Sequence, residues 1–291
     1  MKKFFSCLLV SLFCLFTTSS CVGPSKMPNA QLVRHAGKST VALVYYGHDS
    51  DVPDTEIHPF CSGVWVDDTH ILTAYHCVKA MQKHEQQKQD AREAAQKAKN
   101  AACEGMELLF GMCDPDAVVP HKEIELDGLG VHFIQQAEVD QMGTEPTAWH
   151  LSRVASWDFD HDLALLKATG RAVPAHEIAE LADEVPATGE FVMAVGHPKG
   201  FYWTFLKGTV AGYWETTPAE DSKAPYLQVQ IPIFHGSSGG GVFNAYGQLV
   251  AIVDSMPGLP AEGLCIPVVS IRDFLKAHRS MEALHTLKIG R

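Results

Sequence analysis

Three short segments of the chain carry residue types that together could perform nucleophilic catalysis. His76 ends an apolar segment that begins at Leu72, Asp162 precedes an apolar run at 163–166, and Ser238 lies in the glycine-rich segment 236–241. A serine hydroxyl is a weak nucleophile at neutral pH and needs an adjacent base. A neutral imidazole can accept that proton and return it, and a buried carboxylate can hold the imidazole in one tautomer. We therefore predict that Ser238 is a nucleophile, His76 its base and Asp162 the orienting acid.

The glycines around Ser238 predict a second function for the same loop. Ser238, unlike its neighbour Ser237, has glycine at positions −2, +1 and +2. Glycine adopts backbone conformations that are closed to other residues, so main-chain N–H groups can converge on one point. Such groups stabilise the oxyanion that forms during acyl transfer. We expect the N–H groups of Gly236 and Ser238 to be these donors.

The elements that must position these residues are mostly short strands. Apolar or alternating segments with Gly and Pro between them predict a β-sandwich or barrels; they include 40–46, 61–66, 71–73, 163–167, 191–195, 208–213 and 227–233. Residues 79–102 differ, because they contain Lys, Gln, Glu and Ala but no Gly, Pro or aromatic residue, which favours a helix. This insertion is either a solvated helix that packs lightly on the domain or a contact surface for a partner. A helix is also expected after Ser270, a good N-cap.

The N-terminal segment resembles an export signal. Lys2 and Lys3 precede an apolar run at 4–16 and small polar residues at 17–20, so residues 1–20 are interpreted as a signal peptide. The next residue, Cys21, would carry a lipid if the signal is of the bacterial lipoprotein kind and would anchor the protein to a membrane; a plain secretory signal is the alternative. Residues 21–38 are interpreted as a tether.

Charge and histidine spacing argue against two other classes of function. The formal net charge is −11, which disfavours binding to nucleic acid. A zinc protease would need two histidines on one helical face, as in HExxH, and the segments after His84 and His176 lack the second one. We expect no metal and no organic cofactor, and we assign most histidines other than His76 to the surface or to packing.

The three segments, in this order, resemble the trypsin-like serine peptidases. The motifs are TAxHC at His76, DxALL at Asp162 and GxSGG at Ser238, and only Asp162, not Asp160, fits the second motif. The segments 196–200 (GHPKG) and 263–267 (GLCIP) are similar to loops of the bacterial HtrA-like branch, although no length remains for a PDZ domain.

This resemblance implies an all-β fold of two six-stranded antiparallel β-barrels with the active site between them. The protease domain would span 39–290, with a first barrel at about 39–170 that contains the helical insertion, a second barrel at about 186–268 and a C-terminal helix at about 270–287.

The resemblance also implies a disulfide between Cys61 and Cys77, beside the histidine. Cys103 and Cys113 are close enough in sequence to form a second pair, because an exported protein meets an oxidising compartment. Cys265 lies in an apolar segment and is expected to be a buried, unreactive residue.

Substrate specificity is less constrained by the sequence. In the family the floor of the S1 pocket lies six residues before the serine, at Pro232 here, and Val253 and Leu264 would form its walls, so we expect an apolar P1 residue. Asp254 stands where the family usually has Ser or Thr. It could repel Asp162 or share a proton with it, or it could point into S1 and select a basic residue. His235, at the pocket entrance, could instead favour an acidic residue.

The resulting prediction is a serine endopeptidase that cleaves peptides or proteins through an acyl-enzyme intermediate. The predicted location is outside the cytoplasm, in the bacterial periplasm, on the outer membrane as a lipoprotein, or secreted. The alternative is a binding or chaperone module on a protease fold with little turnover. The oligomeric state stays open.

Overall fold

Two closed antiparallel β-barrels, each of six strands, form the body of the protein, which confirms the predicted fold. The computed structural model describes residues 25–46, 57–110, 123–136, 148–215, 224–256 and 261–289. The first barrel contains β1 (Thr40–Tyr46), β2 (Ile57–Trp65), β3 (His70–Ala74), β4 (Gly130–Gln135), β5 (His150–Asp158) and β6 (Leu163–Ala168). The second contains β7 (Phe191–Gly196), β8 (Thr204–Trp214), β9 (Tyr226–Val229), β10 (Gly241–Asn244), β11 (Leu249–Ser255) and β12 (Gly263–Pro267).

The two barrels share one strand order. Around the first barrel the order is β1-β2-β3-β6-β5-β4, and the second repeats it as β7-β8-β9-β12-β11-β10. In each barrel the third strand therefore pairs with the sixth. In the first barrel this pairing joins β3 to β6 antiparallel, with Ala74 opposite Leu163. His76, just after the end of β3, and Asp162, just before the start of β6, are therefore close together.

The core explains why several strands are continuous hydrophobic runs. Alternate residues of a strand point to opposite faces. On β1, Val41 and Leu43 pack inside the first barrel, whereas Ala42 and Val44 belong to a cluster shared with Met193, Phe243 and other residues of the second barrel. Strands at the junction are thus buried on both faces, as all five residues of β3 are. A third cluster fills the second barrel.

Most of the segment interpreted as a tether forms a helix that the sequence analysis did not predict. Helix α1 (Asn29–Ser39) buries Leu32 and Ala36, which lie on one face at a spacing of four residues. The indole N–H of Trp203 donates to the main-chain oxygen of Gly37 over 3.1 Å. This apolar face therefore ties α1 to the two barrels. The predicted signal peptide and Cys21 lie outside the described residues.

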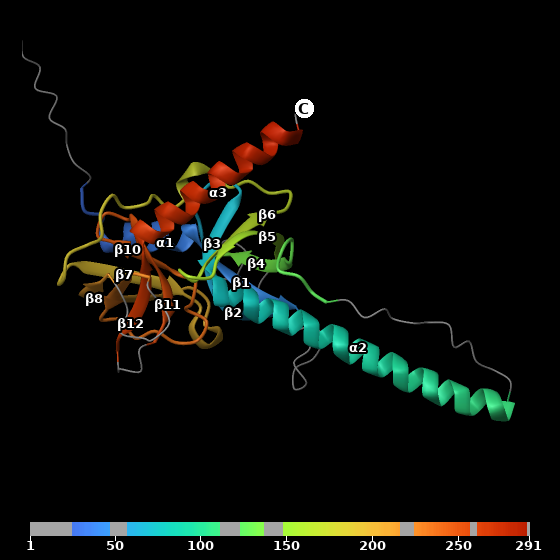
Figure 1. Cartoon of the computed structure of the whole chain (residues 1–291). Helices are drawn as coiled ribbons and strands as arrows, with labels where there is room; N and C mark the ends of the chain where they lie inside the picture. Colours follow the sequence, from blue (N-terminus) through green and yellow to red (C-terminus); the bar gives the residue numbers. More distant parts are fainter. Residues whose placement is uncertain are drawn as a thin grey trace, which may run out of the picture.

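The helical insertion is confirmed but is longer than predicted. Helix α2 (Tyr75–Phe110) begins directly after β3 and therefore includes His76 and Cys77. Figure 1 shows it projecting far from the first barrel, and its 36 residues correspond to about 54 Å. Among the side chains of α2 that the structure describes, the buried ones are Cys77, Val78 and Met81, all near its beginning. The predicted stripe is exposed at Ala91, Ala94, Ala95 and Ala98.

The C-terminal helix is also confirmed. Helix α3 (Val268–Ile289) follows β12 directly and buries Ile271, Phe274 and Leu275 in the shared core. Two short 3-10 helices, η2 (Ala175–Glu177) and η3 (Pro198–Gly200), lie in loops. The side chain of Cys103 and all of Cys113 fall outside what the structure describes. Among the described helices, none is both long enough and apolar enough to cross a membrane.

Candidate active site

The pairing of β3 with β6 brings His76 and Asp162 into contact. His76 Nδ1 lies 2.7 Å from Asp162 Oδ2, and the main-chain N–H of His76 donates to Asp162 Oδ1 over 2.8 Å. Asp162 sits in the turn before β6 with a left-handed φ of 50°, which aspartate tolerates better than most residues. Its carboxylate thus accepts two hydrogen bonds from one residue. This arrangement holds the ring with Nδ1 protonated and leaves Nε2 to take part in proton transfer.

The electrostatic surroundings of His76 favour its protonated form. Partial burial of the ring lowers its pKa, but the hydrogen bond to Asp162 and the negative charges of Asp162 and Asp254 outweigh this, so the pKa is raised above its usual value. The side chain is still 44% exposed. An exposed imidazole whose protonated form is stabilised suits a group that must accept a proton during a reaction.

Ser238 lies in the loop between β9 and β10, whose glycines the geometry requires. Gly236 has a φ of 94°, and a Cβ there would lie 2.3 Å from the main-chain oxygen of His197. Gly239 has a φ of 80°, and a Cβ there would lie 2.1 Å from the main-chain oxygen of Ser62. The Ser62 N–H donates to the Ser238 oxygen over 2.8 Å. The loop of the second barrel is therefore fastened to β2 of the first.

The Ser238 loop lies beside His76, but the Ser238 hydroxyl makes no hydrogen bond to the imidazole. Ser238 Oγ donates to the main-chain oxygen of Asp254 over 3.0 Å. Asp254 Oδ1 is in turn 3.8 Å from His76 Nδ1, and the sulfur of Cys77 lies 3.7 Å from the Ser238 oxygen. The serine loop thus lies beside His76 and Cys77, and the Ser238 hydroxyl donates to a main-chain carbonyl.

The two main-chain N–H groups that we predicted as oxyanion donors differ from their neighbours in the serine loop. The N–H groups of Ser237, Gly239 and Gly240 donate to main-chain oxygens. Within the described part of the chain, the N–H groups of Gly236 and Ser238 have no such acceptor. Two unpaired donors one residue apart, in a loop that also carries the serine, can bind a developing negative charge.

A buried pair that sequence reasoning missed supports this loop from below. Ser62 Oγ donates to the Gly236 oxygen over 2.8 Å and lies 2.9 Å from His197 Nδ1. His197 is fully buried, and this burial lowers its pKa to about 3, so the ring is neutral. Its Nδ1–H therefore donates to Ser62. The available signals were the positions of these residues: Ser62 follows Cys61, and His197 lies in the GHPKG segment.

The carboxyl group of Asp254 faces His76 and Asp162. One ligating atom from each of the three residues lies within 4.8 Å of the others. Burial, then the charge of Asp162 and a hydrogen bond with it, raise the pKa of Asp254 to about 7, against smaller opposing effects of His76 and Tyr226. Of the alternatives left open for Asp254, this geometry favours proton sharing with Asp162 over a place in the S1 pocket.

The other predicted S1 residues lie on neighbouring segments of the second barrel. Val253 is buried on β11, opposite Cys265 of β12, and Leu264 precedes Cys265. Pro232 is partly exposed and His235 is exposed, both in the loop that leads to Ser238. Their roles in substrate selection stay predictions.

The cysteines beside the site have the expected states. A disulfide joins Cys61 to Cys77, with Cα atoms 6.1 Å apart, and connects β2 to the first turn of α2 next to His76. Cys265 is a free, fully buried thiol, and its burial raises its pKa, so it is unreactive as predicted.

Comparisons with known proteins agree with this geometry. The family of the trypsin-like peptidase domain matches residues 61–252, well over half of the chain. A probable periplasmic serine endoprotease, DegP-like, of Pseudomonas putida (strain GB-1) is 40% identical over 92 residues, which are 31% of this chain and 18% of that protein. The chain therefore matches less than a fifth of that relative's length.

Two solved structures share the fold at low sequence identity. The serine endoprotease from Yersinia pestis has a TM-score of 0.52 at 18% identity, covering 87% of this chain and 67% of that one. The structure of an HtrA-type protease with a tripeptide has a TM-score of 0.56 at 15% identity, covering 86% of this chain and 63% of that one. The match of the domain over residues 61–252 decides the classification: this chain belongs to the trypsin-like peptidase domain family.

Proposed function

We propose that the protein is a serine endopeptidase that uses His76, Asp162 and Ser238. The observation that carries the proposal is the double hydrogen bond from His76 to Asp162 beside the Ser238 loop. When substrate binds, Ser238 Oγ turns from the Asp254 carbonyl toward His76 Nε2. His76 then takes the hydroxyl proton as Oγ attacks the peptide carbonyl carbon.

The remaining steps follow from the same groups. The N–H groups of Gly236 and Ser238 hold the oxyanion of the tetrahedral intermediate, and His76 gives its proton to the leaving amine. An acyl-serine ester remains. Water then attacks this ester with His76 again acting as the base, which releases the acid product and restores the serine. Asp162 keeps the imidazole in the required tautomer throughout.

The proposed location is the bacterial cell envelope. The export signal that we interpret at residues 1–20 and the periplasmic designation of the Pseudomonas relative both support it. We further propose that a lipid on Cys21 anchors the protein to the membrane of the envelope. Mass spectrometry of Cys21 in the mature protein distinguishes an anchored protein from a secreted one.

The decisive experiment compares two adjacent serines. Ser238→Ala should reduce kcat by at least about 10⁴-fold, because the nucleophile is lost. The matched control is Ser237→Ala, which should keep activity within a few-fold of the unchanged protein. Covalent labelling by a fluorophosphonate probe, located by peptide mass spectrometry, should occur at Ser238 only. Normal cleavage of a protein substrate by the folded Ser238→Ala protein would refute the proposal.

Two observations favour a second function, a binding module with little turnover. The hydroxyl of Ser238 is engaged with Asp254, and a carboxyl group with a pKa of about 7 stands beside His76. A folded protein that binds unfolded chains but resists the fluorophosphonate probe both alone and with peptide present would establish this alternative.

A further inference from the structure

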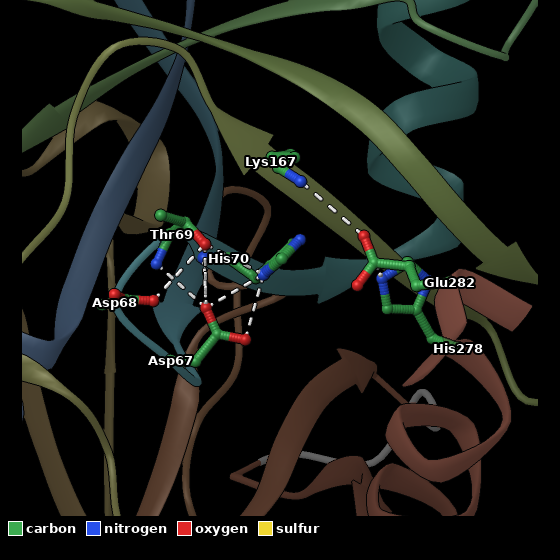
Figure 2. Close-up of polar contacts among 7 residues, drawn as sticks. All are labelled: Asp67, Asp68, Thr69, His70, Lys167, His278 and Glu282. Carbon is green, nitrogen blue, oxygen red and sulfur yellow. Dashed lines mark hydrogen bonds and ion pairs between the residues drawn. The ribbon is translucent and has the colours of Figure 1, made fainter. Parts of the chain in front are cut away.

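A second group of histidine and carboxylate side chains lies away from the candidate active site, between the first barrel and the C-terminal helix. It consists of His70 at the start of β3 and of His278 and Glu282, one turn apart on α3. One possible ligating atom from each residue lies within 4.8 Å of the others. Figure 2 shows His70 with Asp67 on one side and with His278 and Glu282 on the other.

Each of the two imidazoles has a buried ring nitrogen without a hydrogen-bond partner. Nε2 of His70 and Nε2 of His278 are both buried atoms with no hydrogen bond, and each residue is 7% exposed. The rings are 5.5 Å apart between centroids. Buried polar atoms normally have partners, so two unsatisfied nitrogens in one place need an explanation.

The contacts of Asp67 fix the orientation of the His70 ring. Asp67 accepts hydrogen bonds from the N–H groups of Thr69 and His70, at 2.9 and 2.8 Å, and both its oxygens lie within 3.0 Å of His70 Nδ1. A carboxylate in this position accepts a hydrogen bond from Nδ1, so Nε2 is the ring nitrogen of His70 that faces the rest of the group.

His278, on α3, presents the second imidazole nitrogen of the group, and this Nε2 is likewise buried without a hydrogen bond. His278 Nε2 is 3.7 Å from Glu282 Oε1. Neutral imidazole nitrogens together with a carboxylate oxygen form a ligand set typical of zinc, and a carboxylate that orients a ligating histidine is its usual second shell.

From this geometry we propose that His70, His278 and Glu282 bind a divalent transition-metal ion, with zinc as the expected metal and Asp67 as the residue that orients His70. A tetrahedral zinc ion with ligands at about 2.0–2.2 Å separates its ligand atoms by roughly 3.3 Å. The three atoms, within 4.8 Å of one another, reach that spacing through small side-chain movements. Water completes the coordination. The ion links β3 to α3 and so ties the C-terminal helix to the first barrel.

A neighbouring lysine affects how strongly the site binds a cation. Lys167 Nζ is 3.6 Å from Glu282 Oε1, and its charge opposes a bound cation. Its side chain is 55% exposed, so it can turn into solvent.

A surface cavity of about 390 Å³ reaches His278 from the side of Trp157 and Met281 and brings solvent to the helix. Two other groups of possible ligands among the described residues are already engaged. Cys61 and Cys77 beside His76 are bonded to each other, and His76 with Asp162 and Asp254 belongs to the candidate active site.

The test is metal binding to the purified protein after treatment with a chelator. Isothermal titration with zinc should give one ion per chain, and cobalt(II) should give the visible absorption of a tetrahedral nitrogen–oxygen site. Zinc at about 100 times its Kd should raise the melting temperature by roughly 5 °C. Absence of stoichiometric binding at micromolar zinc would overturn the proposal.

Variants locate the site. His278→Ala and Glu282→Gln should each weaken binding by at least about tenfold, and Asp67→Asn by about 10–100-fold. Lys167→Gln should strengthen it. The matched controls are His176→Ala, an exposed histidine elsewhere, and His76→Ala, and both should bind zinc as the unchanged protein does. If His76→Ala abolishes binding while His278→Ala does not, the metal belongs to the other group and the proposal is wrong.

Discussion

Strand β3 has a histidine–carboxylate pair near each of its ends, and the two pairs differ in what faces the second ring nitrogen. At one end Asp67 contacts His70 Nδ1 at 2.9 Å, and at the other Asp162 contacts His76 Nδ1 at 2.7 Å. The His70 side chain is 9% exposed and faces His278, whereas the His76 side chain is 44% exposed and adjoins Ser238. Two similar pairs are thus suited to different chemistry: an imidazole open to substrate can transfer protons, and one enclosed with another imidazole can bind a metal.

The largest expected effect comes from exchanging the two carboxylates for amides. Asp162→Asn should lower kcat by about 10⁴-fold, because the amide no longer stabilises the required tautomer of His76. Asp67→Asn should leave kcat within a few-fold, since His70 takes no part in the reaction. Kinetics on a peptide substrate measure both. If both variants lost activity equally, the Asp67–His70 and Asp162–His76 pairs would not differ in their part in catalysis.

A smaller effect on kcat is expected from Ser62, which holds the serine loop through its hydrogen bond to Gly236. Ser62→Ala removes the hydrogen bond to Gly236 and the partner of His197, so the oxyanion donors lose their alignment, and kcat should fall by roughly 10–100-fold. The matched control is Ser152→Ala, which removes a bond of the same kind, from a buried serine to the Val131 oxygen over 2.8 Å, far along the barrel wall. Both variants should lose similar stability, and only Ser62→Ala should lose activity. Similar activities for the two would contradict a role for Ser62 in positioning the loop.

The smallest expected effect concerns pH. The charge of Asp254 raises the pKa of His76, so Asp254→Asn should move the acid limb of kcat/KM to lower pH by roughly one unit or less. An unchanged acid limb would show that Asp254 does not influence His76.

Stability should respond to the same substitution with a defined sign. The pKa of Asp254 is raised to about 7 by folding, so its contribution to stability is present below about pH 4 and is lost as the pH rises toward 7. Asp254→Asn lacks this dependence. Chemical unfolding at pH 5 and pH 8 should therefore show the variant gaining stability relative to the unchanged protein at the higher pH.

The fold was largely predictable because its signals are local. Short apolar segments between turn residues indicated strands, and the composition of residues 79–102 indicated a helix, because each signal depends on neighbours in sequence. The start of that helix was misplaced, since Tyr75 to Val78 look like a loop in composition and become helical through packing against the barrel. The helix at residues 29–39 was missed for the same reason. Its glycine and polar residues resemble a linker, and tertiary contacts such as the burial of Leu32 and Ala36 stabilise the helix.

What the sequence by itself determined is the set of residue types, their order and the strands that bear them: His76 and Asp162 beside apolar strands, and Ser238 among glycines. Tertiary structure alone decided which side chains meet across long separations. It turned Asp254 toward Asp162, placed Ser62 and His197 beneath Gly236, and brought His278 of α3 to His70 of β3. The physical reason is that such contacts depend on how barrels and helices pack, and this packing leaves no periodic pattern in the residues that it brings together.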